Sequence, residues 1–222
     1  MKFLMILLLV VSCSCSKGTG KKEEVKQQEA AIPIPPDQIV PPLESIKALD
    51  RKIESYKTGA NLTPADLEAN RKLKQEIIRG TFDINELCKR AMDLHWVPMS
   101  EKERKNFVEL MTNLLERKAI FSKEQVRGEG KAYRVDYLNQ TFLDPEKKTA
   151  RVRTKVTVPS QKIDLNIHYE MKLTPYGWQI YDVIVDDASL VENYKFQFDT
   201  IIKKHGRTEL EGRMKKKLAE ME

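Results

Sequence analysis

The spacing of apolar residues along the chain changes from a helical repeat to a strand repeat and back again. Between residues 43 and 115, apolar side chains recur every three or four positions, which is the repeat of amphipathic helices. From about residue 126 to residue 173 they alternate with polar ones, as in strands with one dry face. The pattern predicts helices first, then a sheet, and then further helices.

Four helices are expected before any strand, at residues 43–56, at 63–78, from 84 to about 96–98, and from 101 onward. Capping residues followed by Pro or Glu mark three of these starts: Thr63–Pro64, Asp83–Glu86 and Ser100–Glu103. The apolar face of the third helix is expected to include Leu94. The fourth helix is the longest, and its inner face holds Phe107, Leu110, Met111, Leu114 and Leu115.

Three strands with alternating patterns follow, within residues 126–142, 150–158 and 163–173. Turn residues separate them, Asp144-Pro145 after the first and Pro159-Ser160 after the second. Connections this short join antiparallel neighbours. The third strand alternates most regularly and should present one apolar and one polar face.

A fourth strand is predicted to lead directly into a helix. Trp178–Val185 is apolar, aromatic and β-branched almost throughout, which is typical of a strand covered on both faces. Two sets of its side chains point in opposite directions, and the sequence does not say which faces inward: Ile180 and Ile184, or Tyr181, Val183 and Val185. Ser189, three residues before Glu192, should cap a helix that closes at Gly206. Thr208, with Glu211, is expected to open a last, lysine-rich helix.

These elements predict an α+β fold. N-terminal amphipathic helices precede a curved antiparallel sheet of about four strands, and C-terminal helices pack on one face and enclose an apolar pocket. Apolar residues make up 41% of the 222 residues, which is enough for the core of one domain. The net charge of +6 permits contact with an anionic surface, but no nucleic-acid-binding motif and no metal-ligand spacing accompany it. Cys88 is expected to be a small buried apolar residue.

The first residues are predicted to be a signal peptide. Phe3–Val11 is an unbroken apolar run, shorter than the roughly 20 residues that span a bilayer. The run ends in Val10-Val11-Ser12-Cys13, which resembles the bacterial lipobox, so lipidation of Cys13 is expected. The alternative is an ordinary secretory signal cut a few residues later. The predicted organisation is a signal peptide at 1–12, a lipidated N-terminus and Pro-rich linker at 13–42, and a domain at 43–222.

Two blocks of sequence resemble the MlaC family, whose members are also called toluene-tolerance or ABC-transporter auxiliary proteins. The first block has F-D-I-N-E-L from Phe82, Trp96, and S-E-K-E-R-K-N-F ending at Phe107. The second, more specific block runs from Gly177 to Ile202, and the resemblance extends from about Ile77 to the C-terminus. Asp187 stands where the family usually has glycine, and Lys195 where it usually has arginine.

This resemblance implies a periplasmic phospholipid carrier without catalytic residues, cofactor or metal. Members of the family exchange lipid between an outer-membrane lipoprotein and an inner-membrane ABC transporter with an MCE subunit, which maintains outer-membrane lipid asymmetry. The lipobox departs from the soluble members of the family and implies an anchored carrier. Ser14, after the lipidated cysteine, favours the outer membrane as the site of the anchor.

A carrier needs an apolar wall for acyl chains, and the sequence offers candidates for it on the third strand and on two helices. Each candidate has a plain alternative, which is that it fills the core. The candidates for the lipid pocket are Phe107, Met111, Leu114, Ile163, Leu165, Ile167, Tyr169, Met171, Tyr194 and Phe198.

Two other classes of protein stay open at this point. An envelope lipoprotein could act as a scaffold and bind no small molecule. An enzyme on a cone-shaped α+β fold would need polar groups inside its cavity, and Asp182 and His168 are the candidates for an acid–base pair. The position of Asp182 in the fold tests the enzyme interpretation.

Overall fold

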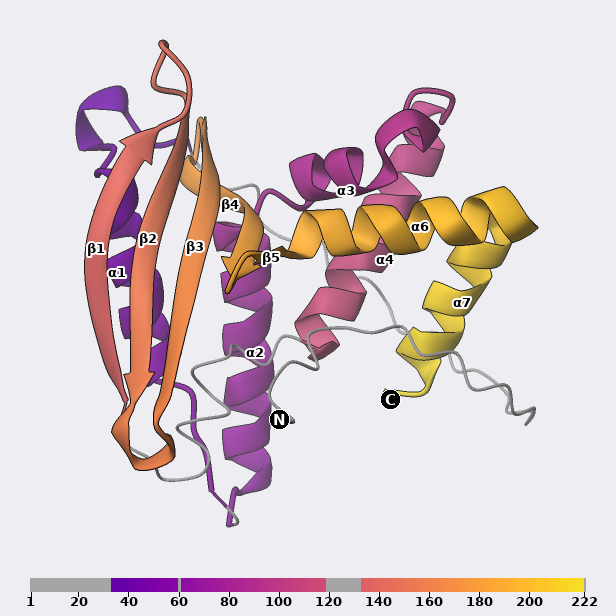
Figure 1. Cartoon of the computed structure of the whole chain (residues 1–222). Helices are drawn as coiled ribbons and strands as arrows, with labels where there is room; N and C mark the ends of the chain where they lie inside the picture. The colour runs from indigo at the N-terminus through magenta and orange to yellow at the C-terminus, as the bar shows by residue number, and fades with distance from the viewer. Residues whose placement is uncertain (1–32, 60, 119–132, 222) are drawn as a thin grey trace. The chain divides into compact units, whose positions relative to one another are not determined.

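A five-stranded antiparallel sheet forms one side of the protein. The computed structural model describes residues 33–59, 61–118 and 133–221. The strands are β1 (Arg134–Phe142), β2 (Thr149–Val158), β3 (Ile163–Thr174), β4 (Gly177–Val185) and β5 (Ala188–Ser189), and they lie in that order across the sheet. The sheet is curved and unclosed, and helices accompany it, so the predicted α+β class is confirmed (Figure 1). The part of the first predicted strand before residue 133 lies outside the described residues.

Two helices cover one face of the sheet. They are α1 (Pro42–Glu54), which packs against β1 and β2, and α2 (Pro64–Thr81), which packs against β4. A short 3-10 turn, η1 (Pro36–Gln38), precedes α1. The backbone N–H of Leu43 donates a hydrogen bond to the Gln140 side chain, 2.9 Å away, and ties the start of α1 to β1. The capping box predicted at Thr63 is present, with Asp66 as its partner.

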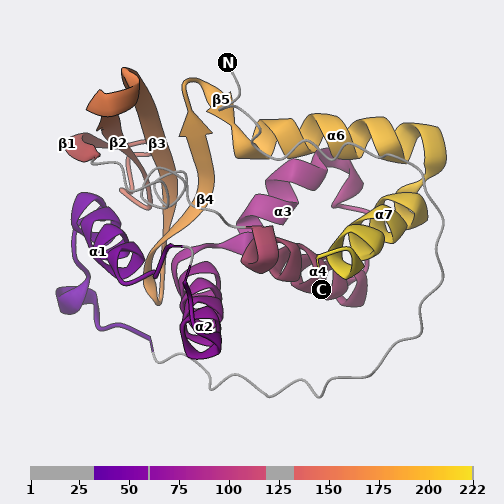
Figure 2. The ribbon, with the colours of Figure 1, turned by 90° about the horizontal axis from the view of Figure 1, so that it is seen from below.

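The other helices pack mainly on one another beside β4. They are α3 (Ile84–Met92), α4 (Glu101–Lys118), α6 (Leu190–His205) and α7 (Arg207–Ala219), with the short turn η2 (Asp93–His95) after α3. Figure 2 shows α3 beside α6 and α4 beside α7, and the helices of each pair are in contact. The Cys88 thiol of α3 has no exposed surface, and burial raises its pKa well above the ordinary value. No helix in the described part of the chain is long and apolar enough to cross a bilayer.

The structure corrects two predictions about helix ends. The helix at α3 stops at Met92 because Asp93 adopts a φ of +46°, so Leu94 leaves the apolar face and is 80% exposed. The last helix begins at Arg207 with no side-chain cap, so Thr208 lies inside it and does not cap it. Gly206 joins α6 to α7 with a φ of +83°, a conformation that glycine adopts without strain.

A β-bulge in β4 answers the question that the alternating pattern left open. Glu170 lies opposite Asp182, whereas the next residue of β3, Met171, lies opposite Ile180, so Tyr181 is an extra residue in β4. Residues directly opposite in an antiparallel pair share a face, and a bulge changes which side chains face inward. Ile180 therefore shares the face of Met171, and Val183 shares the face of Tyr169. Each predicted set contributes to the inner face.

Asp182 holds the start of α6 against the sheet. Its side chain is only 6% exposed and accepts hydrogen bonds from the Ser189 hydroxyl (2.6 Å) and the Val191 backbone N–H (3.0 Å). Burial raises the pKa of Asp182, although these hydrogen bonds oppose the rise. His168 lies opposite Ile184 rather than Asp182. Asp182 is thus engaged in anchoring a helix, and the pair with His168 that the enzyme interpretation requires is not formed.

Removal of the Asp182 side chain should destabilise the protein by about 2 kcal/mol, because a buried N–H and a hydroxyl lose their acceptor. Asp182→Ala measured by urea unfolding tests this. The control is Asp164→Ala, which removes a half-exposed partner of Lys155 and should cost less than about 1 kcal/mol.

The effect of Asp182→Ala should also depend on pH. A carboxyl group whose pKa is raised in the folded state stabilises that state most when protonated. The difference between native protein and variant should therefore shrink as pH rises from 3.8 through the folded-state pKa of Asp182. A difference that grows with pH would contradict this assignment.

Candidate lipid-binding site

The inner face of the sheet is an apolar layer beneath α1 and α2. Ile167, Tyr169 and Met171 of β3 are 3%, 7% and 0% exposed. Across the ladder they lie opposite Thr154, Val152 and Ala150 of β2, each of which has no exposed surface. From α1, the layer is completed by buried residues at helical spacing, Ile46, Leu49 and Ile53. Three of the strand candidates therefore lie together on one buried face of β3.

Leu165 marks the less tightly covered end of this layer. Its side chain is half-buried, whereas Val156 opposite it is buried. Ile163, the remaining strand candidate, lies opposite Val158 in the backbone register, and its side chain is outside the described residues. An acyl chain on this face would meet side chains that belong to β2, β3 and α1.

A polar pair formed by a buried and a half-buried side chain, which was not predicted from the sequence, interrupts the apolar layer. The Tyr137 hydroxyl of β1 donates a 2.6 Å hydrogen bond to Asp50 of α1, and Asp50 is only 8% exposed. Burial and the hydrogen bond to Asp50 both raise the pKa of Tyr137, so the phenol stays protonated at neutral pH. The sequence does contain a signal for the burial of Asp50. This residue lies between Leu49 and Ile53, on the side of α1 that faces the sheet.

The helical candidates form a second cluster between α4 and α6. The rings of Phe107 and Phe198 meet edge to face, with centroids 5.7 Å apart, and Tyr194 stacks on Phe198 at 5.3 Å. Met111 and Leu114 of α4 are also buried, at 1% and 7% exposure. The predicted pocket residues thus fall into two groups, one on the sheet under α1 and α2 and one between helices.

A polar network joins α3 to the outer face of the sheet. Glu86 of α3 accepts hydrogen bonds from Lys172 of β3 and from Arg90, both at 2.9 Å. Burial would raise the pKa of Glu86, but the hydrogen bond and the charge of Lys172 outweigh it and hold the pKa below its ordinary value. The Arg90 guanidinium lies 4.2 Å from the centre of the Tyr181 ring. This network fixes α3 without using the inner face.

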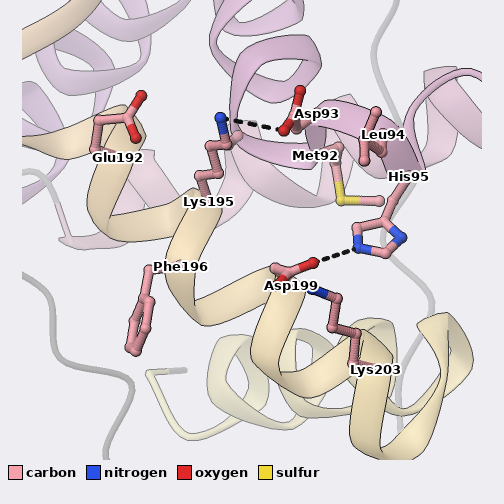
Figure 3. A pocket seen from close by; sticks show the side chains of 10 residues that line it. Met92, Asp93, Leu94, His95, Glu192, Lys195, Phe196, Asp199 and Lys203 are labelled. Atoms are coloured by element: carbon pink, nitrogen blue, oxygen red, sulfur yellow. Dashed lines mark hydrogen bonds and ion pairs between the residues drawn. The ribbon is translucent and has the colours of Figure 1, made fainter.

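A cavity of about 350 Å³ opens between η2 and α6 (Figure 3). Its lining includes Met92. An ion pair joins Lys195 to Asp93 (3.1 Å), and a hydrogen bond joins His95 to Asp199 (3.0 Å). Lys203 pairs with the other oxygen of Asp199, and together Lys203 and His95 hold the pKa of Asp199 below its ordinary value. The wall of this cavity is partly polar and partly apolar, and it contains none of the predicted pocket residues. Within the described ranges, no three His, Cys, Asp or Glu side chains are grouped to hold a metal ion.

The sheet-and-helix arrangement with a buried apolar layer agrees with the comparisons with known proteins. The MlaC protein family matches residues 47–216, and the chain belongs to this family. No curated protein sequence matches the chain.

One solved structure with the same fold is the phospholipid-binding protein from Ralstonia solanacearum, in complex with a phospholipid at 1.53 Å resolution. The TM-score is 0.63 and the sequence identity is 19%, over 81% of this chain and 97% of the other. At this identity, the likeness shows the fold alone.

Two phenylalanines of α6 provide a matched test of the helical cluster. Phe198→Ala should reduce the free energy of unfolding by about 3–5 kcal/mol, because it leaves a cavity beside Phe107 and Tyr194. Phe196→Ala, at a side chain that is 75% exposed, should change it by less than about 0.5 kcal/mol. Urea unfolding of both variants measures the difference, and equal effects would contradict the packing described here.

Proposed function

We propose that this protein binds a phospholipid and carries it between membranes, with acyl chains held against the inner face of β3. The observation that supports this most directly is the buried apolar layer of Ile167, Tyr169 and Met171 under two amphipathic helices. Membership of the MlaC family supports the proposal. So does the phospholipid-binding protein that shares its fold.

The energetics of lipid transfer explain why a carrier needs such a layer. Each methylene exposed to water costs about 0.8 kcal/mol. A phospholipid has on the order of 30 methylenes, so an unprotected lipid would face a cost on the order of 20 kcal/mol. Apolar side chains that replace the bilayer remove most of this cost, and contacts that depend on shape rather than hydrogen bonds let the lipid leave again.

The two groups of candidates have different roles in this proposal. Leu165, which is half-buried, lies where a chain can reach the inner face, and Ile167 and Met171 continue that face inward. The aromatic cluster around Phe198 packs α4 against α6.

The partners and location are part of the same proposal. An inner-membrane ABC transporter with an MCE subunit and an outer-membrane lipoprotein would exchange lipid with this protein, in support of outer-membrane lipid asymmetry. The protein would act in the periplasm, held by a lipid on Cys13, with the outer membrane as the favoured site. The lipobox-like sequence and the family support this placement.

An envelope scaffold without a ligand is the second candidate function. It is favoured by the near-complete burial of Ile167 and Met171, which would also suit a core filled by protein alone. The two functions differ in one measurable property, the phospholipid content of the purified protein.

Native protein purified from membrane-containing cells should release close to one phospholipid per chain on extraction with organic solvent. Leu165→Lys should abolish loading, because an ammonium group would lie on the wall that contacts acyl chains. Asn166→Lys, a change at the next residue, whose side chain points to the opposite face, should retain the lipid. Mass spectrometry of the extracts measures the ratio.

Thermal unfolding of the same samples shows whether Leu165→Lys folds. If it does not, Leu165→Trp fills the same space without a charge and should reduce loading. Native protein that contains no phospholipid would support the scaffold function instead.

Cys13 should be the first residue of the mature chain and should carry a diacylglycerol on its sulfur. Intact-mass measurement of detergent-extracted protein tests this. Cys13→Ala should leave the protein unlipidated, whereas Cys15→Ala should not change the modification. An unmodified N-terminal peptide that contains Cys13 would contradict the anchor.

A further inference from the structure

We propose that one end of the sheet rests on the surface of the membrane that holds the lipid on Cys13. This inference rests on the anchor in the proposed function and adds the face that meets the bilayer. The hairpin end is defined here by four exposed apolar side chains, which are Ile34, Phe142, Leu143 and Tyr176.

The hairpin end gathers exposed apolar side chains from separate segments. The β1–β2 turn contributes Phe142 and Leu143, which are 39% and 44% exposed, and the β3–β4 turn contributes Tyr176, which is 44% exposed. A hydrogen bond of 2.8 Å from the Leu173 N–H to the Lys148 carbonyl holds the two turns together. Grouped apolar side chains on a surface indicate a contact site.

The N-terminal part of the chain joins the domain at this same end. The Ile34 N–H donates a 2.8 Å hydrogen bond to the Pro175 carbonyl in the β3–β4 turn. The Ile34 side chain packs beside Gly177, where an added Cβ would lie 3.4 Å from it. The described part of the chain therefore begins at the hairpin end, where Ile34 is fastened.

The length of the N-terminal segment limits how far this end can lie from the bilayer. Cys13 to Ile32 is 20 residues, so even a fully extended chain would span at most about 70 Å. A lipid on Cys13 holds the domain within that distance, and the hairpin end is the part that the tether reaches first. Tethering also raises the local concentration of this face at the membrane surface, which makes a weak contact effective.

The chemistry of the β1–β2 turn suits the membrane interface. The Asp144 carboxylate turns inward and accepts hydrogen bonds from the backbone N–H groups of Lys148 (3.1 Å) and Thr149, while Glu146 pairs with Lys148 at 2.7 Å. The Lys147 ammonium lies 5.7 Å from the centre of the Phe142 ring. Aromatic rings and lysine side chains are the groups that proteins place at the headgroup level.

A different exposed patch provides the control. Leu94, Val97 and Phe196 are 75–80% exposed, more than any member of the hairpin end, but they belong to η2, the loop after it, and α6. Exposure alone would favour this patch for membrane contact, whereas the tether favours the hairpin end. Labels placed on the two faces separate these possibilities.

The test uses the mature, lipidated chain in vesicles of phosphatidylethanolamine and phosphatidylglycerol. In a Cys15→Ser background, Leu143→Cys or Tyr176→Cys is labelled with a fluorophore that nitroxide lipids quench, and Val97→Cys is the control. Native Cys88 has no exposed surface and should not react with the label. The label at residue 143 or 176 should lose most of its fluorescence, while the label at residue 97 should lose little.

Equal quenching at residues 143, 176 and 97, or stronger quenching at 97, would overturn the proposal. A mature chain without lipid on Cys13 would overturn it as well, because the tether argument would fail. Phospholipid content is measured by extraction of the same protein preparations before they are added to vesicles. Bound phospholipid with an unquenched label at residue 143 rejects only the membrane contact. Quenching without bound phospholipid rejects only the carrier function.

Discussion

The fold depends on β4 being covered on both faces. On the inner side, Ile180 and Met171 meet under α2, and on the outer side Tyr181 lies under Arg90 of α3. The bulge makes this possible because it gives β4 one residue more than its partner strand. Asp182 then fastens the start of α6 to the same strand. β4 thus links the sheet and its two covering helices to the helices beside it.

Many elements could be predicted from the sequence because their signals are local. Capping residues such as Thr63, Asp83 and Ser189 mark helix starts through bonds to residues three positions away, and all three bonds are present. The bulge at Tyr181 and the pair of Asp50 with Tyr137 have no such signal, because they arise between segments that are distant in sequence. The helix end at Asp93 was missed because helical spacing continues to Leu94 although the backbone does not.

The candidate site was predicted in part for the same reason. Strict alternation in β3 identifies Leu165, Ile167, Tyr169 and Met171 as one face, and the register places them there. Helical spacing identified Phe107 and Phe198 as inward-facing but could not say which element they meet. They meet each other, between α4 and α6. The periodicity of apolar residues indicates which side of an element faces inward. It does not indicate which other element that side contacts, because this depends on how the helices pack in three dimensions.

The burial of Cys88 has a consequence for its reactivity. Thiol–disulfide exchange requires an accessible thiolate, and Cys88 is neither accessible nor readily ionised. A surface cysteine can form disulfides with neighbouring proteins under oxidising conditions. The sulfur of Cys88 is withheld from such reactions, so it can remain a thiol in the core whatever the redox state of the surroundings.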